Sequence, residues 1–450
     1  MSVVNPKNGA DLMNPAWGSM PLKYLLASMG SGGTPSTDDE TQWGVNGEGV
    51  PWVAIADMSQ TRHVASTSKT VSAKGVAEKR LAIWPAGTLL MSMYASLGHV
   101  ARLGVPAATN QAILALQPRS DVDIGFLEYW LTGVQPLLKA NSNSNTQDNL
   151  NAEKVANLPA TKPPLDLQRR IAAFLDDETA RIDELVQEQE RLVALLDEEL
   201  EARLLRLVLG LDPYTASWQP TDWLPTTPEG WRRVALRHVS GVRCDGPFGS
   251  SLRSEHYTQA GARVVRLQNI RARRFDNSDA VYIDEAYAAS LRHHAVEPGD
   301  LLVAGLGDDT NPVGRACVAP PWIGQAIVKA DCFRIRLNSA TTHPPFIAAQ
   351  LSSTAPIHAP MLANGSTRSR IPLGKMAGRS LLLPPIETQR QITGEIDRID
   401  DHAEKLKGAA QSATLLLAER RSALITAAVT GQIDVSAWTP PDDWLSPEAA

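Results

Sequence analysis

An internal repeat constrains the architecture of this 450-residue chain more than any other feature. The segment Pro-Pro-Leu-Asp-Leu-Gln-Arg-Arg-Ile begins at Pro163, and its counterpart Pro-Pro-Ile-Glu-Thr-Gln-Arg-Gln-Ile begins at Pro384, an offset of 221 residues. The two segments end at Gly210 and Gly431, again 221 residues apart. Upstream, shorter matches continue with slightly different offsets, as loop insertions produce. Such a fixed period predicts two copies of one folding unit.

Each copy ends in a segment with the pattern of a long helix. Pro-Pro suits the approach to a first turn, and glycine suits the C-terminal cap. Apolar residues recur at spacings of three, four and seven, as in a coiled coil. A single rod of roughly 60 Å is marginal in water, so we expect the two helices to pair with each other rather than to pack separately on their globular neighbours. The residues of the two stripes are Ile182, Leu185, Leu192, Leu196, Leu200, Leu204 and Leu207, and Ile399, Ala403, Leu406, Ala410, Ala413, Leu417 and Leu424.

The globular part of each copy is expected to be mixed α/β. Short apolar runs between Gly, Pro and Asn turns predict strands at 53–55, 89–91, 112–116, 264–267, 301–303 and 333–337, with helices at 124–138 and 346–351. The expected fold class is α+β: two mixed α/β domains, each followed by a long helix, the two helices pairing as an antiparallel coiled coil. The expected boundaries are 1–158 for the first domain, 159–212 for the first spacer helix, 213–383 for the second domain, 384–435 for the second spacer helix and 436–450 for a C-terminal tail.

The charge is unevenly distributed. The net charge is −6, yet residues 163–210 contain twelve acidic residues and six Arg, so the rest of the chain is about neutral. The first long helix is therefore the acidic part, and we expect its outward face to meet protein rather than phosphate. Because no apolar run approaches about 18 residues and no leader pattern opens the chain, neither membrane spanning nor export is indicated. The isolated Cys244, Cys317 and Cys332 suit buried thiols. We expect a cytoplasmic protein.

Motifs that carry chemistry are missing from the sequence. No GxxxxGK[ST] phosphate loop occurs, and the nearest approach to an amino-methyltransferase motif is Asn14-Pro15-Ala16-Trp17, with no strand before it. The adjacent Asp308 and Asp309 fit a solvated turn better than a metal site. We expect no catalytic residue, no metal and no cofactor in this chain.

The most informative polar segment is basic. Within twelve residues free of acids, Arg side chains alternate with Gln and Asn, and these residue types pair with guanine, phosphate and adenine. An equally good reading of this segment alone is a strand whose Arg residues face water. The equivalent stretch of the first copy is also basic, which favours DNA contact, and the Gly-rich and Ser/Thr-rich turns add weaker candidates. The candidate DNA-binding residues are Arg263, Arg266, Gln268, Asn269, Arg271, Arg273, Arg274, Thr367, Arg368, Arg370, Arg62, Lys69, Lys74, Thr146, Gln147, Thr34 and Ser36.

The order of these motifs resembles the specificity subunits of type I restriction-modification enzymes. The matching elements are Gly-Gly-Thr-Pro-Ser at 32–36, the Gly-Ser-Thr-like stretches, the Pro-Pro-(x)3-Gln-Arg segments and Ala-Val-Thr-Gly before residue 432. The first copy departs locally, with Ser-Asn-Thr at 144–146 for Gly-Ser-Thr. The resemblance implies that each globular part is a target recognition domain for one half of a bipartite DNA site, and that the helices set the gap.

The resemblance also implies partners. It predicts double-stranded DNA, two modification (methyltransferase) subunits and motor-nuclease restriction subunits, with S-adenosylmethionine, ATP and magnesium held by those partners and none by this chain. The competing interpretation is a tandem-repeat protein-interaction scaffold without DNA binding. Salt-dependent binding to duplex DNA separates the two interpretations, because phosphate contacts weaken steeply with salt.

Overall fold

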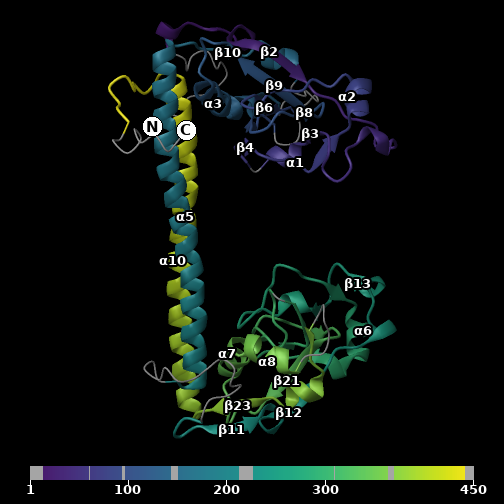
Figure 1. Ribbon diagram of the computed structural model, residues 1–450. Coiled ribbons are helices and arrows are strands. Elements are labelled where there is room, and N and C mark those ends of the chain that lie inside the picture. Colours follow the sequence, from purple (N-terminus) through teal and green to yellow (C-terminus); the bar gives the residue numbers. More distant parts are fainter. Residues whose placement is uncertain are drawn as a thin grey trace. The chain divides into compact units, whose positions relative to one another are not determined.

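The computed structural model of the chain describes residues 14–59, 61–93, 97–142, 151–211, 227–308, 310–362 and 369–440. The chain forms two compact units, one made of Met1–Gln189 with Gln411–Ala450 and the other of Glu190–Ala410. Each unit contains one globular copy together with the adjoining parts of both long helices, α5 (Leu165–Leu209) and α10 (Ile386–Val429) (Figure 1). Within the described residues, no helix is long and apolar enough to cross a bilayer.

The first unit is built on a five-stranded sheet beside a three-stranded one. Their orders are β2-β9-β6-β7-β4 and β5-β3-β8, and a short pair β1-β10 joins the two ends of the copy. Helix α3 (Ile124–Ser142) follows β9, and helices α1 (Ile55–Met58), α2 (Ala73–Lys79) and α4 (Ala152–Ala156) lie in the connections. The strands are β1 (Met20–Pro21), β2 (Leu26–Ser31), β3 (Val50–Val53), β4 (His63–Val64), β5 (Lys69–Val71), β6 (Leu89–Ser92), β7 (Val100–Leu103), β8 (Ala108–Thr109), β9 (Ile113–Pro118) and β10 (Pro159–Ala160).

The second unit repeats this topology. Its sheets have the orders β12-β21-β17-β19 and β13-β15-β14-β20-β16, with pairs β11-β23 and β18-β22. Helices α6 (Glu285–Ser290), α7 (Pro344–Ser353), α8 (Ala355–Leu362) and α9 (Leu373–Ala377) complete it. The strands are β11 (Arg232–Ala235), β12 (Ser240–Cys244), β13 (Tyr257–Thr258), β14 (Ala262–Val265), β15 (Tyr282–Ile283), β16 (Ala295–Val296), β17 (Leu301–Ala304), β18 (Leu306–Gly307), β19 (Ala316–Val318), β20 (Ala326–Val328), β21 (Cys332–Leu337), β22 (Ser369–Arg370) and β23 (Ser380–Leu383).

The strand pairings of the two units correspond one to one at the centre. The antiparallel run β2-β9-β6-β7 matches β12-β21-β17-β19. In each unit one further strand, β3 or β14, pairs antiparallel with the strand that follows it and parallel with a later one. The predicted repeat is therefore also a repeat of topology.

The expected strand at 53–55 is wrong beyond Val53. Strand β3 ends there, and helix α1 begins at Ile55. The Asp57 side chain accepts a hydrogen bond from the backbone N–H of Ala54 over 2.8 Å, which stabilises the first turn of a helix. The same local preference acts in the second copy, where β14 ends at Val265 and a 3-10 turn covers Leu267–Asn269.

The long helices begin and end where the repeat predicts. Helix α5 starts directly after Pro163-Pro164 and α10 directly after the second Pro-Pro. At the ends, Gly210 and Gly431 have φ of +64° and +75°, a conformation that glycine adopts without strain. A Cβ at Gly210 would lie 2.8 Å from the Trp231 ring, and one at Gly431 would lie 2.8 Å from the Trp17 ring. Each helix thus ends against the first tryptophan of the other copy.

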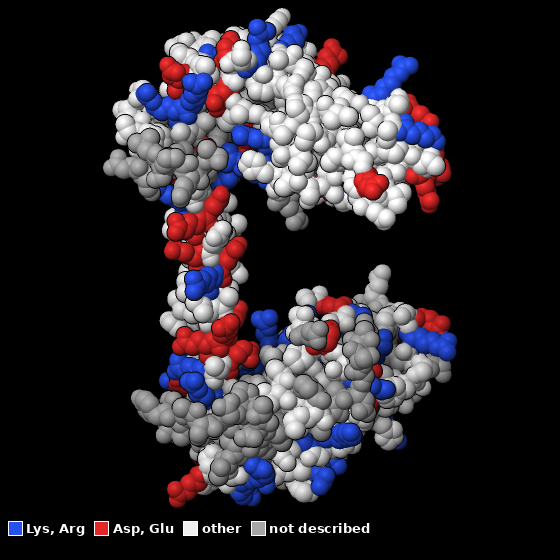
Figure 2. Space-filling view, in the orientation of Figure 1, with Lys and Arg blue, Asp and Glu red and all other residues white. Residues whose placement is uncertain are grey.

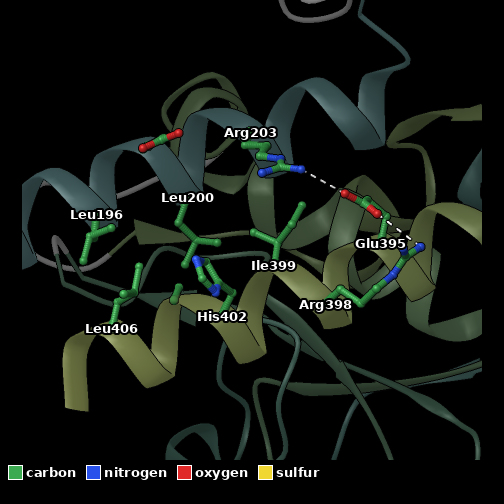
Figure 3. A pocket seen from close by; sticks show the side chains of 10 residues that line it. Leu196, Leu200, Arg203, Glu395, Arg398, Ile399, His402 and Leu406 are labelled. Atoms are coloured by element: carbon green, nitrogen blue, oxygen red, sulfur yellow. Dashed lines mark hydrogen bonds and ion pairs between the residues drawn. The ribbon is translucent and has the colours of Figure 1, made fainter. Parts of the chain in front are cut away.

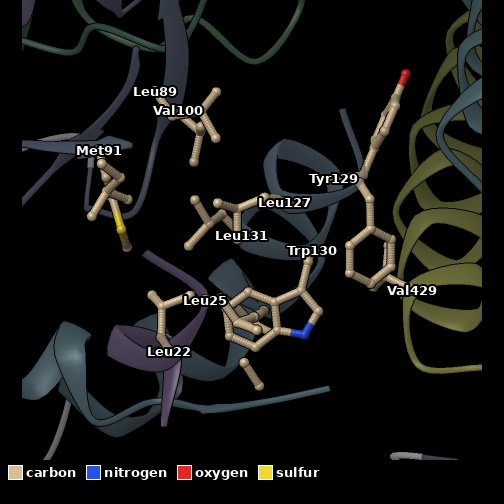
Figure 4. Packing of buried hydrophobic residues seen from close by; sticks show 14 of the residues in the cluster. Leu22, Leu25, Leu89, Met91, Val100, Leu127, Tyr129, Trp130, Leu131 and Val429 are labelled. Atoms are coloured by element: carbon tan, nitrogen blue, oxygen red, sulfur yellow. The ribbon is translucent and has the colours of Figure 1, made fainter. Parts of the chain in front are cut away.

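The core of the first unit shows the same exchange. Trp130 of α3 is buried with Leu22, Leu25 and Met91, and Val429 from the end of α10 belongs to the same cluster (Figure 4). In the second unit, Leu204, Val208 and Leu209 from the end of α5 are buried against Leu382 and Ile396. Each globular copy is therefore completed by the helix that follows the other one.

The predicted antiparallel pairing of the two helices is confirmed. In the second unit, Asp197 pairs with Lys407, and Arg203 pairs with Glu395 over 2.9 Å, so that one helix ascends as the other descends. Ala403 and Ala410 are buried, as the stripe predicts, but Leu185, Leu192 and Leu406 remain more than a third exposed. Two helices alone are too narrow to cover an apolar stripe of this width.

Candidate nucleic-acid interface

The basic stretch of the second unit forms a folded loop that is held from inside. Asn269 is fully buried; its Oδ1 accepts from the Arg266 N–H over 2.8 Å, and its Nδ2 donates to the carbonyls of Asp276 and Asp279. Arg263 is only 5% exposed and donates to Asn277 and to the Asp279 carbonyl. These two predicted DNA contacts build the loop, and the structure does not bring them to the surface.

Two aspartates just beyond the acid-free window take up much of its positive charge. Arg266 and Gln268 both donate to Asp279, and Arg271 pairs with Asp276 over 3.2 Å. Hydrogen bonds from Ser278, together with Arg271, lower the pKa of Asp276 to about 2. The window drawn on the sequence stopped before these acids, so it overstated the free positive charge of the loop.

The tip of this loop is a tight hairpin. The Arg271 N–H donates to the Arg274 carbonyl over 3.1 Å, and Ile270 bridges Phe275. Arg273 reaches Asp400 on helix α10, at 2.9 Å between Nη2 and Oδ1. Arg274 is exposed. Of the five arginines in the stretch, Arg274 is the one placed most openly for a solvent-side ligand.

A polar hollow lies beside this loop and joins it to another predicted segment. Strand β18 pairs with β22, with Leu306 opposite Arg370, so that the basic loop and the strand after the Gly-Ser-Thr-Arg stretch share one region. Arg370 is half exposed, donates to Asp331 over 2.8 Å and lies 5.4 Å from the centre of the Phe248 ring. The hollow is lined by Leu267, Gln268, Arg271, Leu306, Gly307, Asp308, Asn311 and Arg315.

Phe248 is a candidate that the sequence reasoning missed. It is 50% exposed in the loop Gly246-Pro-Phe-Gly, whose first glycine lies so close to the Lys329 backbone that a Cβ would be 2.0 Å from its carbonyl carbon. An exposed aromatic ring beside a guanidinium can stack on a base or contact a thymine methyl group. The signal was present, because a lone aromatic in a Gly- and Ser-rich loop has no packing reason to be there.

In the first unit the predicted residues are also partly occupied. Thr34 donates to Gln111, and the Ser36 N–H donates to Gln42 over 2.7 Å, so this loop is fixed internally. Lys74 pairs with Asp39 over 3.1 Å. Hydrogen bonds from Thr41 and then Lys74 lower the pKa of Asp39 to about 2.

Arg62 and Lys69 have different surroundings. Arg62 pairs with Glu128 and with Asp176 of helix α5, at 3.0 Å between Nη1 and Oδ1 in the second pair. Lys69 is exposed, with Nζ 5.0 Å from the centre of the Trp43 ring. Lys69 is therefore the predicted residue of the first copy that is best placed to meet a ligand.

Around Lys69 the surface forms a hollow that the sequence reasoning did not anticipate. Asn46 and Gly47 have φ of +55° and +82°, which turns the chain sharply and leaves Val45 69% exposed. Asn-Gly is a strong turn signal, and it marked this hairpin in the sequence. The hollow is lined by Thr37, Glu40, Trp43, Gly44, Val45, Asn46, Gly47, Thr67, Ser68, Lys69 and Thr70.

Four predicted contacts, Thr146, Gln147, Thr367 and Arg368, lie outside the described residues. In the described part, no group of three or more His, Cys, Asp or Glu could hold a metal ion. Asp308 forms the predicted turn, accepting from the N–H groups of Thr310 and Asn311. The Asn311 backbone hydrogen bond is the main reason that the pKa of Asp308 is lowered.

The paired helices have a surface of another kind. Figure 2 shows Asp and Glu side chains gathered along them. In the second unit, Leu196 and Leu200 face Ile399 and Leu406 across an apolar groove, and the Arg203–Glu395 pair lies at its edge (Figure 3). A surface that alternates leucine with carboxylate favours protein over the DNA backbone.

Comparisons with known proteins agree with the resemblance in the sequence. Residues 16–193 match the family model of the type I restriction modification DNA specificity domain. The chain is 25% identical over 251 residues to the type I restriction enzyme MjaIX specificity subunit of Methanocaldococcus jannaschii, covering 54% of this chain and 56% of that relative. It is 22% identical over 396 residues to the EcoBI specificity subunit of Escherichia coli, covering 86% of this chain and 80% of that one. It thus spans little more than half of the first relative.

Solved structures share the fold. A chain from a study of complex assembly and conformational transition of the type I R-M system has a TM-score of 0.66 at 17% identity, covering 94% of this chain and 99% of its own length. The HsdS subunit from Thermoanaerobacter tengcongensis has a TM-score of 0.53 at 18% identity, covering 94% and 98%. The predicted fold class and the predicted resemblance are both confirmed.

Proposed function

This chain belongs to the family of type I restriction-modification specificity subunits, and from that premise we propose that its two globular copies each read one half of a bipartite DNA site. In this account the chain selects the DNA sequence and leaves the chemistry to partner subunits. The two globular copies are called recognition domains from here on.

The observation that carries the proposal is the duplicated topology, with an exposed basic surface at comparable places in both copies. Lys69 in the first domain and Arg274 and Arg370 in the second supply cations for phosphate contacts. Gln268 is an amide of the type that reads adenine, although it is also bonded to Asp279 in the free protein. Binding DNA would exchange that internal partner for a base.

The long helices act as the spacer in this account. A helix rises 1.5 Å per residue and B-DNA rises about 3.4 Å per base pair, so a rod of fixed length selects one gap. Because the acidic helix repels phosphate, we place protein partners on its outer face. The exposed Leu415 and Leu416 of α10, at 67% and 65%, are suited to docking a modification subunit.

The catalytic steps belong to those partners. We assign S-adenosylmethionine and methyl transfer to the two modification subunits, and ATP, magnesium and cleavage to the motor-nuclease restriction subunits. The role of this chain is to hold the modification subunits at a chosen sequence. A cytoplasmic location goes with this role.

Selection from a random duplex library by the full-length chain tests the reading function. The expected result is an enriched motif of two short blocks separated by a fixed gap, with affinity that falls steeply with salt. Binding that is absent, or that ignores salt and sequence, would favour the tandem protein-interaction scaffold instead.

A matched deletion tests the spacer function. Removing seven residues from the middle of α5 and the seven opposite them in α10 shortens the rod by about 10 Å, which is about three base pairs. The gap should shorten by that number while both blocks of the motif stay the same. A change in the blocks themselves would contradict the spacer assignment.

A further inference from the structure

In each unit, one arginine of the recognition domain is bound to an aspartate on a long helix. Arg62 Nη1 lies 3.0 Å from Asp176 Oδ1 on α5, and Arg273 Nη2 lies 2.9 Å from Asp400 Oδ1 on α10. Both arginines come from the stretches whose composition suggested DNA contact. The structure places their guanidinium groups on the spacer instead.

The Arg273 pair has a geometry that few surface ion pairs have. Nε and Nη2 both reach the carboxylate, with Nε 3.3 Å from Oδ2, and the arginine side chain is mostly covered. Such two-point contacts fix direction as well as distance. Arg273 also has φ of +65°, which costs a residue with a Cβ roughly 1 kcal/mol relative to glycine. An arginine at this position therefore indicates that its side chain is needed.

The Arg62 pair belongs to a larger cluster. Arg62 also binds the buried Glu128, which holds Arg102 over 2.6 Å as well. The guanidinium lies 4.7 Å from the centre of the Tyr129 ring, and the Tyr129 hydroxyl donates to Asp176 over 2.7 Å. Asp176 is therefore held by two groups of the recognition domain.

Each aspartate supplies a second polar attachment between domain and helix. The first is a buried glutamine near the start of the helix, Gln168 in α5 and Gln389 in α10, whose Oε1 accepts a backbone N–H from the recognition domain. Asp176 lies eight residues beyond the first glutamine and Asp400 eleven beyond the second, which is about 12 and 16 Å along the helix. One attachment fixes a position, whereas two attachments also fix an angle.

We propose that the Arg62–Asp176 and Arg273–Asp400 pairs are positioning contacts, which set the angle of each recognition domain on the spacer and so sharpen the choice of gap between the half-sites. The inference rests on the proposed function. The repeat offset places Asp176 opposite Asp397, so Asp400 lies one turn further along its helix. The two copies thus share the kind of contact and differ in its register.

The test measures gap selectivity separately from half-site selectivity. The full-length chain is bound to duplexes that carry its selected half-sites at the preferred gap and at one base pair more or fewer. Arg273→Gly removes the side chain and relieves the φ strain, and Asp400→Asn breaks the ion pair while leaving the Arg273 charge in place. We expect both variants to lower the discrimination between gaps at least fivefold and to leave the preferred bases unchanged.

Two controls sharpen the result. Asp401→Asn alters an exposed carboxylate next to Asp400, and Arg274→Ala removes a charge next to Arg273; both should keep the gap selectivity of the original chain. The charge swap Arg273→Glu with Asp400→Arg should restore selectivity. A thermal melt shows whether each variant is folded, and Arg273→Lys keeps the charge without the two-point contact should Arg273→Gly unfold.

Three outcomes overturn the inference. If Asp400→Asn keeps the original gap selectivity, the pair has no positioning role. If it raises affinity at every gap alike while Arg273→Gly lowers it alike, Arg273 is a phosphate contact that Asp400 merely occupies. If the unaltered chain prefers no gap and no split motif, the proposed function itself fails, a result distinct from the other two.

Discussion

The Oε1 atom of Gln389 accepts a hydrogen bond from the backbone N–H of His343 over 2.8 Å, which joins the start of the spacer helix α10 to the start of helix α7. The Nε2 atom of Gln389 donates to the carbonyls of Thr341 and Pro384. In the first copy, Gln168 accepts from the Asp123 N–H over 2.7 Å and donates to the Pro163 carbonyl. The glutamine of the repeated motif thus locks spacer to domain twice.

Replacing this glutamine should destabilise the second unit. Gln389→Leu leaves one N–H and two carbonyls without their partner in a buried place, and we expect a loss of about 3 kcal/mol, or several degrees in Tm for a unit of this size. Gln391→Leu, on the exposed side of the same helix, should change stability by less than about 0.5 kcal/mol. Thermal unfolding of the full chain measures both. Equal melting of the two variants would contradict the structural role of Gln389.

The stability of the second unit should depend on Asp245. Burial raises the pKa of Asp245 to about 6, from an ordinary value of 3.8. Between these values the folded protein binds a proton that the unfolded chain does not, so the free energy of unfolding falls as pH rises. Asp245→Asn removes the charge and keeps an oxygen acceptor for the N–H groups of Gly246 and Asp331.

We therefore expect Asp245→Asn to be more stable than the original chain at pH 7.5, by about 1 kcal/mol once partial exposure is allowed for. At pH 4 the difference should nearly vanish, because Asp245 is then protonated in the folded protein. Urea unfolding at the two pH values makes the comparison. A stabilisation of the same size at both would show that the charge is not its cause.

Exposed cations should set the salt dependence of DNA binding. Lys69→Ala should weaken binding similarly at all sequences and reduce the slope of log K against log salt by about 1. Lys74→Ala is the matched control, because Lys74 is already paired with Asp39 and its removal should change the slope less. Titrations over a range of salt concentrations decide the matter. Equal slopes for the two variants would place the phosphate contacts elsewhere.

The exposed leucines of α10 should matter for assembly and not for folding. Leu415→Lys with Leu416→Lys should leave Tm nearly unchanged, because both side chains are mostly in solvent. The same variant should lose co-purification with the modification subunits, whereas Glu419→Lys on the exposed surface of the helix should retain it. Unchanged assembly in the leucine variant would remove this face from the proposed docking surface.

The sequence predicted the architecture well because periodicity and caps are local properties. Pro-Pro and Gly bounded both helices correctly, and the repeat predicted the matching sheets. It did not reveal the exchange by which α10 completes the core around Trp130, since that depends on contacts about 300 residues apart. Chain order alone associates each helix with the domain before it.

The candidate site was predicted less well, for an electrostatic reason. The basic stretch was defined by the residues within a window, while Asp276, Asp279 and Asp400 neutralise it from outside that window. Composition also cannot separate a buried Arg263 from an exposed Arg274. Phe248 and Trp43 were passed over because single aromatic residues are usually core residues.

The most direct test of the central claim is a map of methylated sites in genomic DNA from cells with and without this chain. Our account predicts one split motif, two short blocks with a fixed gap, that is methylated only when the chain is present. Methylation that is the same in both cells, or a chain-dependent motif that is continuous, would contradict it.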